Sequence, residues 1–326
     1  MSKVCILGGG AWGSALACVA RRAGHETTLW SRNKFVVDAI NQKGNNPKYL
    51  DDLPLESGIQ ATSELSVALA DADIALFAVP AQSIGETAKS AAQFIKSGTI
   101  NIACAKGIDR ETGQTPGETI AKETPDCQIA ALSGPSFASD VVQKLPTAVT
   151  IGSQDMALSQ QLTATLSTGE FRCYASDDLK GVELGGALKN VLALAVGAAR
   201  GMQLGASAEA ALIARGFAEI SRLAVALGAE PQTLSGLSGL GDLVLTCSTP
   251  QSRNFSYGIA LGQSKDLQGL KLAEGAFTAR IAAKIANEQD IDTPIIQTVT
   301  AVLDKKLSAK DAVVQLLRRP LKSENK

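Results

Sequence analysis

A glycine-rich segment near the N-terminus limits the fold of this chain more than any other feature. Residues 8–13, GGGAWG, contain the pattern G-x-G-x-x-G between an apolar run, Val4–Leu7, and a segment with apolar residues at helical spacing, Ala11–Ala23. In a dinucleotide-binding fold the first glycine forms a tight turn, the second lets the backbone approach a pyrophosphate, and the third lets helix and strand pack closely. The glycines at those positions are Gly8, Gly10 and Gly13. An ordinary glycine-rich turn is the alternative, but the flanking strand and helix favour a pyrophosphate site at a helix N-terminus.

The first half of the chain alternates predicted strands with predicted helices. The helix Ile84–Ile95, like Ala11–Ala23, lies between two apolar strand-like runs. This alternation, with strands that are apolar almost throughout, predicts a Rossmann-like α/β domain with a parallel sheet covered by helices on both faces. The predicted strands are Val4–Leu7, Glu26–Trp30, Ile74–Val79, Thr99–Cys104, Gln128–Leu132, Ala148–Ile151 and Phe171–Tyr174.

After about Ser176 the sequence no longer predicts strands, and helical spacing dominates. We therefore expect a Rossmann-like dinucleotide-binding domain at residues 1–178 and an all-α substrate domain at residues 179–326. The long apolar segment Ala206–Leu227 suits either a homodimer interface or a buried core. The predicted helices are Leu179–Arg200, Ala206–Leu227, Ser252–Leu261, Ala276–Asn287 and Thr293–Asp304.

Composition excludes several classes of partner. With 31 Lys and Arg against 32 Asp and Glu the net charge is −1, so the chain has no electrostatic reason to bind nucleic acid or an acidic membrane surface. It has no run of about 18 uncharged apolar residues to span a bilayer, and its strand-like start predicts no signal peptide. The six cysteines form no C-x-x-C pair, and one histidine leaves a metal site almost without ligands. A cytoplasmic location is therefore expected.

The choice of cofactor depends on the end of the second predicted strand. Dinucleotide-binding folds usually place an acidic residue there, where it binds the ribose hydroxyls. Here the strand ends in residues 29–32, LWSR, without an acid. Arg32 could contact a 2′-phosphate, which favours NADP(H) or tolerance of both NAD(H) and NADP(H), whereas a plain surface arginine is the alternative. The lone His25 precedes this strand, away from the ligand edge of the sheet, so we expect it to be structural and another side chain to transfer protons.

Two lysines are candidates for proton transfer and substrate contact. Lys106 follows the strand Thr99–Cys104 at its carboxyl end, where open α/β sheets bind ligands, and residues 133–136, SGPS, follow the next strand in the same way. Lys189 lies in an apolar helix just after two glycines at 185–186, which cost a helix about 1 kcal/mol each relative to alanine. Space for a ligand would explain those glycines, and burial would lower the pKa of Lys189 and suit it to proton transfer. The alternative is a lysine that reaches the surface.

The helical half also contains a predicted phosphate site. Ser252 can cap a helix whose free N–H groups point outward, and Arg253 adds a planar guanidinium fork. The triplet ends at Asn254 and follows residues 239–243, GLGDL, and 246–248, TCS.

Seven segments in this order resemble the bacterial-type NAD(P)-dependent glycerol-3-phosphate dehydrogenases, from Val4 to about Leu317. They are Gly8–Gly13, 105–107 (AKG), 133–138 (SGPSFA), Gly185–Asn190, Gly239–Thr246, Gln251–Asn254 and 274–275 (EG). The resemblance implies a reversible, metal-free reduction of dihydroxyacetone phosphate to sn-glycerol 3-phosphate by NAD(P)H, which would supply glycerol 3-phosphate for phospholipid synthesis. It implies that Lys189 transfers the proton, while Lys106 orients the substrate and polarises its carbonyl. The substrate would be held by Lys106, Gly134, Ser136, Lys189, Asp242, Ser252, Arg253 and Asn254. The cofactor would be contacted by Gly8, Gly10, Ala11, Trp12, Gly13, Arg32, Lys106, Ala138, Arg253, Leu272 and Glu274.

The chain departs from the family pattern at two places. Ala11 stands where the family often has a serine, which removes one side-chain hydrogen bond to the cofactor phosphates. The segment from Gly262 to Glu274 is shorter than usual, which affects the placement of Leu272. Two other functions remain open: a related two-domain dehydrogenase acting on a hydroxyacid or a hydroxyacyl thioester, and an NADP-binding sensor without catalysis. The sensor would leave Lys106, Lys189 and Asp242 without a role.

Overall fold

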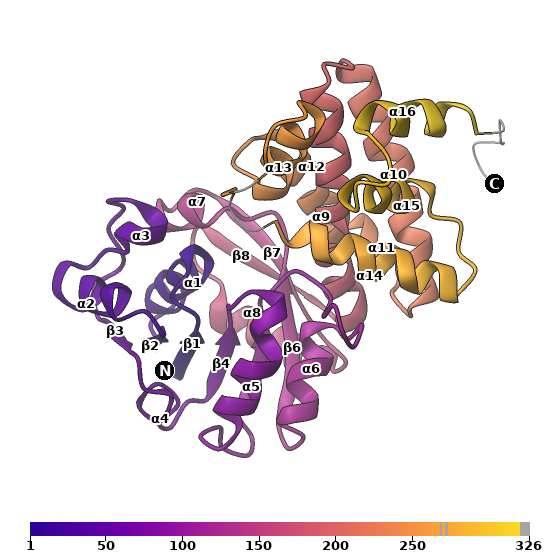
Figure 1. Cartoon of the computed structure of the whole chain (residues 1–326). Coiled ribbons are helices and arrows are strands. Elements are labelled where there is room, and N and C mark those ends of the chain that lie inside the picture. Colours follow the sequence, from indigo (N-terminus) through magenta and orange to yellow (C-terminus); the bar gives the residue numbers. More distant parts are fainter. Residues whose placement is uncertain (268, 271–272, 320–326) are drawn as a thin grey trace.

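The computed structural model describes every residue except 268, 271–272 and 320–326. An eight-stranded sheet with helices on both faces forms the N-terminal part, and a cluster of helices forms the C-terminal part (Figure 1). The strand order is β3-β2-β1-β4-β5-β6-β7-β8, whose first six positions are those of the classic dinucleotide-binding sheet. The strands are β1 (Lys3–Leu7), β2 (Glu26–Trp30), β3 (Ile59–Thr62), β4 (Ile74–Phe77), β5 (Ile100–Ala103), β6 (Gln128–Ser133), β7 (Thr147–Ser153) and β8 (Phe171–Ser176).

The sheet corrects two expectations from the sequence. Strands β1 to β6 are parallel, as expected, but β7 runs antiparallel to β6 and β8 is parallel to β7, so the sheet is mixed. The connection from β6 to β7 contains the five-residue helix Ala138–Val142. Strand β3 was not predicted, because its four residues, IQAT, are too few to show a clear period.

Helices cover both faces of the sheet. Apolar side chains of α1 and α8 pack on one face, and those of α5 and α6 pack on the other. The helices of this part are α1 (Ala11–Arg22), α2 (Lys34–Lys43), α3 (Pro47–Leu50), α4 (Leu65–Ala68), η1 (Ala81–Ser83), α5 (Ile84–Ala92), α6 (Pro116–Glu123), α7 (Ala138–Val142) and α8 (Met156–Leu166).

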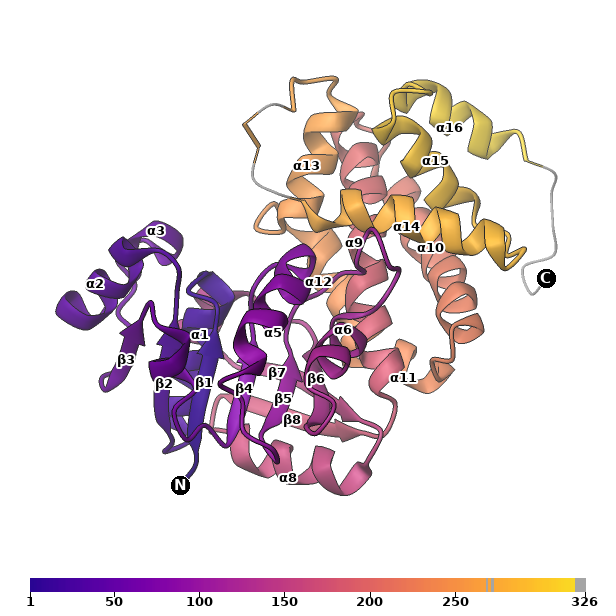
Figure 2. The same ribbon diagram turned by 60° about the horizontal axis from the view of Figure 1, so that its bottom comes forward.

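The C-terminal part is built around one long helix, α9, which lies between its neighbours in both views (Figure 2). By length and composition α9 could cross a membrane, but 94% of its apolar window is buried inside the protein. The helices here are α9 (Leu179–Gly201), α10 (Ala206–Ala226), α11 (Pro231–Ser235), η2 (Leu237–Gly241), α12 (Asp242–Ser248), α13 (Arg253–Gly262), α14 (Glu274–Glu288), α15 (Pro294–Leu303) and α16 (Ala309–Leu317). The η2 segment is a π-helical turn.

Glycines let α9 and α13 cross at very short range. A Cβ atom added at Gly258 would lie 2.3 Å from the carbonyl oxygen of Leu194, and one at Gly197 would lie 2.2 Å from that of Phe255. Both distances are far inside van der Waals contact, so any larger residue would push the two backbones apart. This crossing fixes the start of α13, where the predicted phosphate site lies.

The two parts also pack against each other. All strands of the described chain end by Ser176 and α9 begins at Leu179, at the expected change from sheet to helices. Val182, in the first turns of α9, belongs to the apolar layer on one face of the sheet. The carboxyl ends of β5 and β6 therefore face the helix that carries Lys189.

Candidate active site

The glycine-rich loop between β1 and α1 has the geometry expected of a pyrophosphate site. Gly8 has φ +134°, and a Cβ there would lie 2.7 Å from the carbonyl oxygen of Ala78, so only glycine fits the turn. A Cβ on Gly13 would lie 1.8 Å from the carbonyl oxygen of Gly8, which accounts for the close packing of α1 on the loop. The space beside Gly10, by contrast, holds no atom within 4 Å of such a Cβ. Of the three glycines, Gly10 is therefore the one that leaves room for a ligand.

The first turn of α1 fits the phosphates of a dinucleotide. Its N-cap is Gly10, which has no side chain to bond the first N–H groups, and the helix dipole favours an anion there. Ala11 and Trp12 follow in this turn, and the buried indole N–H of Trp12 has no hydrogen-bond partner among the residues described. A buried N–H without a partner is costly, so a ligand acceptor near Trp12 would stabilise the site. The residues present thus fit NAD(P)(H).

Arg32 lies just beyond the end of β2 and is largely exposed. Its Nη1 lies 3.7 Å from Oε2 of Glu86, in the first turn of α5. Arg32 is therefore free to turn toward a 2′-phosphate, but a carboxylate stands beside it and would repel that group.

A buried carboxylate joins the two candidate lysines. Nζ of Lys106 donates to Oδ2 of Asp242 at 2.7 Å, and Nζ of Lys189 donates to Oδ1 of the same side chain at 2.8 Å. The Asp242 and Lys189 side chains are only 2% and 7% exposed, and that of Lys106 is 18% exposed. Lys106 also donates to the carbonyl oxygen of Gly134 at 2.8 Å. Two cations and one anion leave this cluster with a net charge of +1, which suits an anionic substrate.

Burial tunes the proton affinity of the cluster. It lowers the pKa of Lys189 to about 8, with the charge of Lys106 acting in the same direction and that of Asp242 opposing both. Burial alone would raise the pKa of Asp242, but the two ammonium groups outweigh it and hold that pKa below its ordinary value. Asp242 is therefore ionised, and the pKa of Lys189 lies closer to neutral pH than that of an ordinary lysine. A surface-reaching Lys189, the alternative from the sequence, does not occur.

The two glycines before Lys189 serve packing instead of a ligand, which corrects the expectation from the sequence. A Cβ on Gly185 would lie 3.0 Å from the carbonyl oxygen of Ser238 in η2, and one on Gly186 would lie 2.4 Å from Oγ of Ser133 at the end of β6. The space at these glycines is filled by protein atoms. They bring α9 close to both the sheet and η2, so that Lys189 reaches Asp242 at the start of α12.

The predicted phosphate triplet begins α13. Oγ of Ser252 accepts from the N–H of Phe255 at 3.3 Å, as a helix cap does, and the exposed Arg253 is the first residue of the helix. Asn254 bonds two other parts of the site, because its Nδ2 donates to Oδ1 of Asn190 and its Oδ1 accepts from the N–H of Gly275, both at 2.9 Å.

The remaining predicted contacts lie around this cluster. Oγ of Ser136 donates to the carbonyl oxygen of Gly134 at 3.0 Å, and Ala138 is the first residue of α7. Oε1 of Glu274, at the start of α14, accepts from the N–H of Ala81 at 3.2 Å and so links the two parts of the chain. Burial raises the pKa of Glu274. Leu272 lies outside the described residues.

The structure adds two residues that lie in the segments quoted above but were assigned no role from the sequence. Thr246 is four residues after Asp242 on α12, and its Oγ1 accepts a hydrogen bond from Nζ of Lys189. Asn190 donates to the carbonyl oxygen of Lys106 at 3.3 Å. The i, i+4 spacing of Asp242 and Thr246 could have indicated a shared helix face.

The lone histidine has a structural role, as expected. Nδ1 of His25 accepts from the N–H of Ser2 at 3.2 Å, and Nε2 then donates to the carbonyl oxygen of Thr165 at 2.8 Å. No group of three or more His, Cys, Asp and Glu side chains that could hold a metal ion occurs in the described part of the chain.

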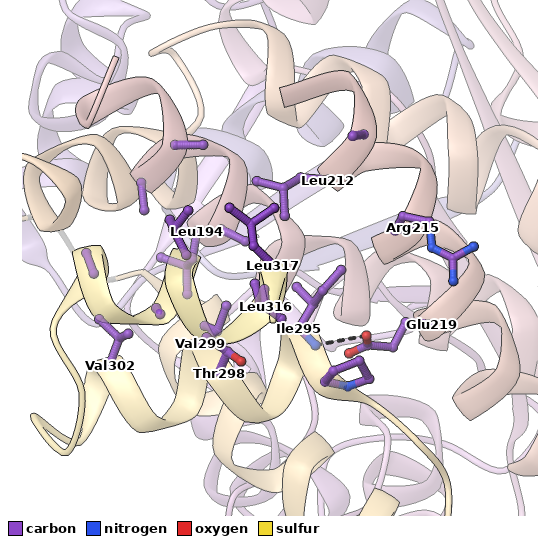
Figure 3. A pocket seen from close by; sticks show the side chains of 18 of the residues that line it. Leu194, Leu212, Arg215, Glu219, Ile295, Thr298, Val299, Val302, Leu316 and Leu317 are labelled. Carbon is purple, nitrogen blue, oxygen red and sulfur yellow. Dashed lines mark hydrogen bonds between the residues drawn. The ribbon is translucent and has the colours of Figure 1, made fainter. Parts of the chain in front are cut away.

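A cavity lies in the helical part, apart from this cluster (Figure 3). Its volume is about 970 Å³, and its walls come mainly from α9, α10, α15 and α16. Leu194, Val299 and Leu316 are among the apolar side chains that line it. At one end Glu219 caps α15, accepting from the N–H of Ile295 at 2.9 Å.

The fold and the site together define a class of protein, an NAD(P)-dependent oxidoreductase with a Rossmann-type sheet and two lysines bound to one buried carboxylate. The family models described as the N-terminus and the C-terminus of NAD-dependent glycerol-3-phosphate dehydrogenase match residues 3–159 and 178–314. The chain therefore belongs to the NAD-dependent glycerol-3-phosphate dehydrogenase family.

Individual relatives cover the whole chain. Glycerol-3-phosphate dehydrogenase (NAD(P)+) of Brucella canis is 51% identical over 324 residues, 99% of both chains. The protein of the same name from Mesorhizobium japonicum is 52% identical over 322 residues, 99% of this chain and 94% of the relative. A crystal structure of glycerol-3-phosphate dehydrogenase from Coxiella burnetii matches with a TM-score of 0.92 and 36% identity, covering 98% of this chain and 99% of that one.

Proposed function

We propose that this chain reduces dihydroxyacetone phosphate to sn-glycerol 3-phosphate with NADPH or NADH, reversibly. The observation that carries the proposal is the pair of lysines held by one buried carboxylate, Asp242, between the sheet and α9. A ketone reduction needs a proton donor and a cation beside the developing alkoxide, and the two ammonium groups provide both.

When bound, the reduced nicotinamide supplies the hydride that adds to the C2 carbonyl carbon. The ammonium of Lys189 donates a proton to the carbonyl oxygen as charge develops there, and in the reverse direction the neutral amine accepts it. Lys106 holds the substrate oxygens and lowers the energy of the alkoxide. Asp242 fixes both ammonium groups in position, so little reorganisation is needed during the reaction.

The substrate phosphate binds at the start of α13 in this proposal. The guanidinium of Arg253 offers a planar fork, and the first N–H groups of the helix add a positive partial charge. Ser136 and Asn254 complete the substrate contacts. Anchoring the phosphate there positions C2 beside Lys189.

The proposal also covers the roles of the two domains, the location of the enzyme and its oligomeric state. Residues 1–178 bind the dinucleotide and residues 179–326 bind most of the substrate. The enzyme is cytoplasmic, where thiols stay reduced, in keeping with its six free cysteines. It supplies glycerol 3-phosphate for phospholipid synthesis, and the apolar helices of the C-terminal part suit a homodimer.

A direct assay tests this function against the alternatives. Purified protein is mixed with NADPH or NADH and dihydroxyacetone phosphate, and the loss of reduced-cofactor absorbance is followed. The expected result is rapid oxidation that depends on dihydroxyacetone phosphate, with no oxidation on 2-oxoacids or on 3-oxoacyl thioesters. Turnover of one of those compounds instead would favour the related dehydrogenase. Tight cofactor binding without any turnover would favour the sensor.

A further inference from the structure

Asn46 is a fully buried residue whose side chain does not bond its own helix. It is the N-cap residue of α3, and asparagine at this position ordinarily accepts a hydrogen bond from the helix's own N–H groups. Asn46 makes no such bond. Its Nδ2 instead donates to the carbonyl oxygen of Gly9 at 3.0 Å and to Oγ of Ser14 at 2.8 Å. The side chain thus leaves its own helix uncapped and joins the glycine-rich loop to α1.

The direction of this amide is fixed by its partners. The carbonyl oxygen of Gly9 can only accept, so the amide nitrogen of Asn46 must face it. Asn46 and Ser14 are both 0% exposed, and water does not compete with these bonds. Oδ1 of Asn46 has no hydrogen-bond partner in the described part of the chain.

The glycine-rich loop needs the bond from Asn46 because three consecutive glycines, at 8–10, are flexible unless other groups hold them. Glycine loses more conformational entropy on folding than other residues, and Gly8 already adopts φ +134°. The N–H of Gly8 is held by the carbonyl oxygen of Trp30 at 3.0 Å, which fixes one end of the turn. Asn46 fixes the next carbonyl group, that of Gly9.

Fixing the carbonyl of Gly9 also fixes the N–H of Gly10. The two groups belong to one planar peptide, which is trans, so they point in opposite directions. With its carbonyl turned toward Asn46, the peptide directs the Gly10 N–H away from it. Gly10 is the residue with open space beside it and the N-cap of α1, where the pyrophosphate is expected.

We propose that Asn46 is a positioning residue for the dinucleotide. It holds the Gly9–Gly10 peptide in the orientation that presents an N–H group to the cofactor phosphate, before the cofactor arrives. A loop ordered in advance binds its ligand more tightly, since less entropy is lost on binding. The inference rests on the proposed function only in requiring that this chain binds NAD(P)(H).

Asn101 provides a matched control. It is also 0% exposed, its Nδ2 donates to Oγ1 of Thr124 at 3.0 Å, and its Oδ1 likewise lacks a described partner. It lies on β5 and does not bond the glycine-rich loop. A substitution at Asn101 therefore disturbs a buried asparagine without touching the loop.

The experiment compares Asn46→Ala and Asn46→Asp with Asn101→Ala and Asn101→Asp. The Kd for NADPH is measured by titration calorimetry, the Tm by thermal unfolding without cofactor, and kcat at saturating NADPH. We expect Asn46→Ala to raise the Kd about 3- to 10-fold, the effect of one lost hydrogen bond, while kcat changes less than about twofold. Asn46→Asp places a carboxylate against the Gly9 carbonyl and should weaken binding further. The Asn101 variants should lower the Tm but leave the Kd unchanged.

Two results would overturn the proposal. One is an unchanged Kd in the Asn46 variants, and the other is an equal rise of the Kd in the Asn101 variants. Should Asn46→Ala fail to fold, Asn46→Asp, which keeps the side-chain volume, decides by the same comparison. Since calorimetry uses no dihydroxyacetone phosphate, a wild-type protein inactive on that substrate would refute the proposed reaction and leave this test intact.

Discussion

The lowered pKa of Lys189 makes the reaction depend on pH in a way that can be worked out in advance. In the proposed mechanism reduction requires the ammonium form of Lys189, whose pKa is about 8. With that pKa, about nine-tenths of the enzyme carries the proton at pH 7 and about one-tenth at pH 9. The kcat/KM for dihydroxyacetone phosphate should therefore fall about tenfold between these pH values. A lysine with an ordinary pKa of about 10.4 would leave kcat/KM almost unchanged over this range.

Neither the substrate phosphate nor Cys247 produces this fall. The substrate phosphate, with a second pKa of about 6, is already a dianion above pH 7. Burial raises the pKa of Cys247, whose charge interacts with that of Lys189, to about 12. Oxidation of glycerol 3-phosphate needs the neutral amine, so its kcat/KM should rise through the same pH range.

The assay is initial-rate absorbance of the reduced cofactor from pH 6 to 10, in both directions, for wild type, Asp242→Asn and Lys189→Ala. Because Asp242 raises the pKa of Lys189, its replacement should move the falling limb to lower pH. Lys189→Ala should lose about 10²-fold or more in turnover and have no limb near pH 8. A flat wild-type profile from pH 7 to 9, or near-normal activity of Lys189→Ala, would refute the role of Lys189.

Three further predictions test other parts of the structure. Arg253→Ala should raise the KM for dihydroxyacetone phosphate about 10- to 100-fold by removing a charge-assisted phosphate contact, and a KM that stays the same would place the phosphate elsewhere. Glu86→Gln removes the carboxylate 3.7 Å from Arg32. The kcat/KM for NADPH divided by that for NADH should therefore rise about 2- to 5-fold in this variant. In Arg32→Ala the same ratio should fall. If the wild type, Glu86→Gln and Arg32→Ala all had the same ratio, Arg32 would not contact the 2′-phosphate. Gly258→Ala should lower the free energy of unfolding, measured in urea, by about 1–3 kcal/mol, because the added Cβ would press on the backbone of α9. The control Gly169→Ala, where the added Cβ meets open space, should change the free energy of unfolding by less than about 0.5 kcal/mol.

Parts of the site were predictable from short stretches of sequence. The turn at Gly8, with φ +134°, and the packing of Gly13 on the carbonyl oxygen of Gly8 are local, so a six-residue pattern between a strand and a helix was enough to predict them. The cap of α13 at Ser252 is local for the same reason. The apolar runs of β1 and β4 likewise predicted strands, because burial on both faces leaves a continuous hydrophobic pattern.

The direction of β7 could not be predicted from the residues of the strand. An apolar run predicts a buried strand but not which way it runs, since parallel and antiparallel pairing bury the same side chains. Only the pairing of β7 with β6 in the folded sheet shows that the two strands are antiparallel. The two glycines at 185–186 were similarly visible in the sequence, but their reason, contact with η2 and Ser133, required the packed structure.

The sequence by itself thus determined that the chain has a dinucleotide loop, apolar strands, long helices and two lysines at suggestive places. Only the tertiary structure decided that Lys106 and Lys189, 136 and 53 residues from Asp242, share its carboxylate. The pKa of Lys189 depends on how much water that packing removes, and Asn46 acquires a partner 37 residues away only when α3 folds against the loop. Desolvation and long-range hydrogen bonds arise only in the folded protein, because they depend on residues that are far apart in the sequence.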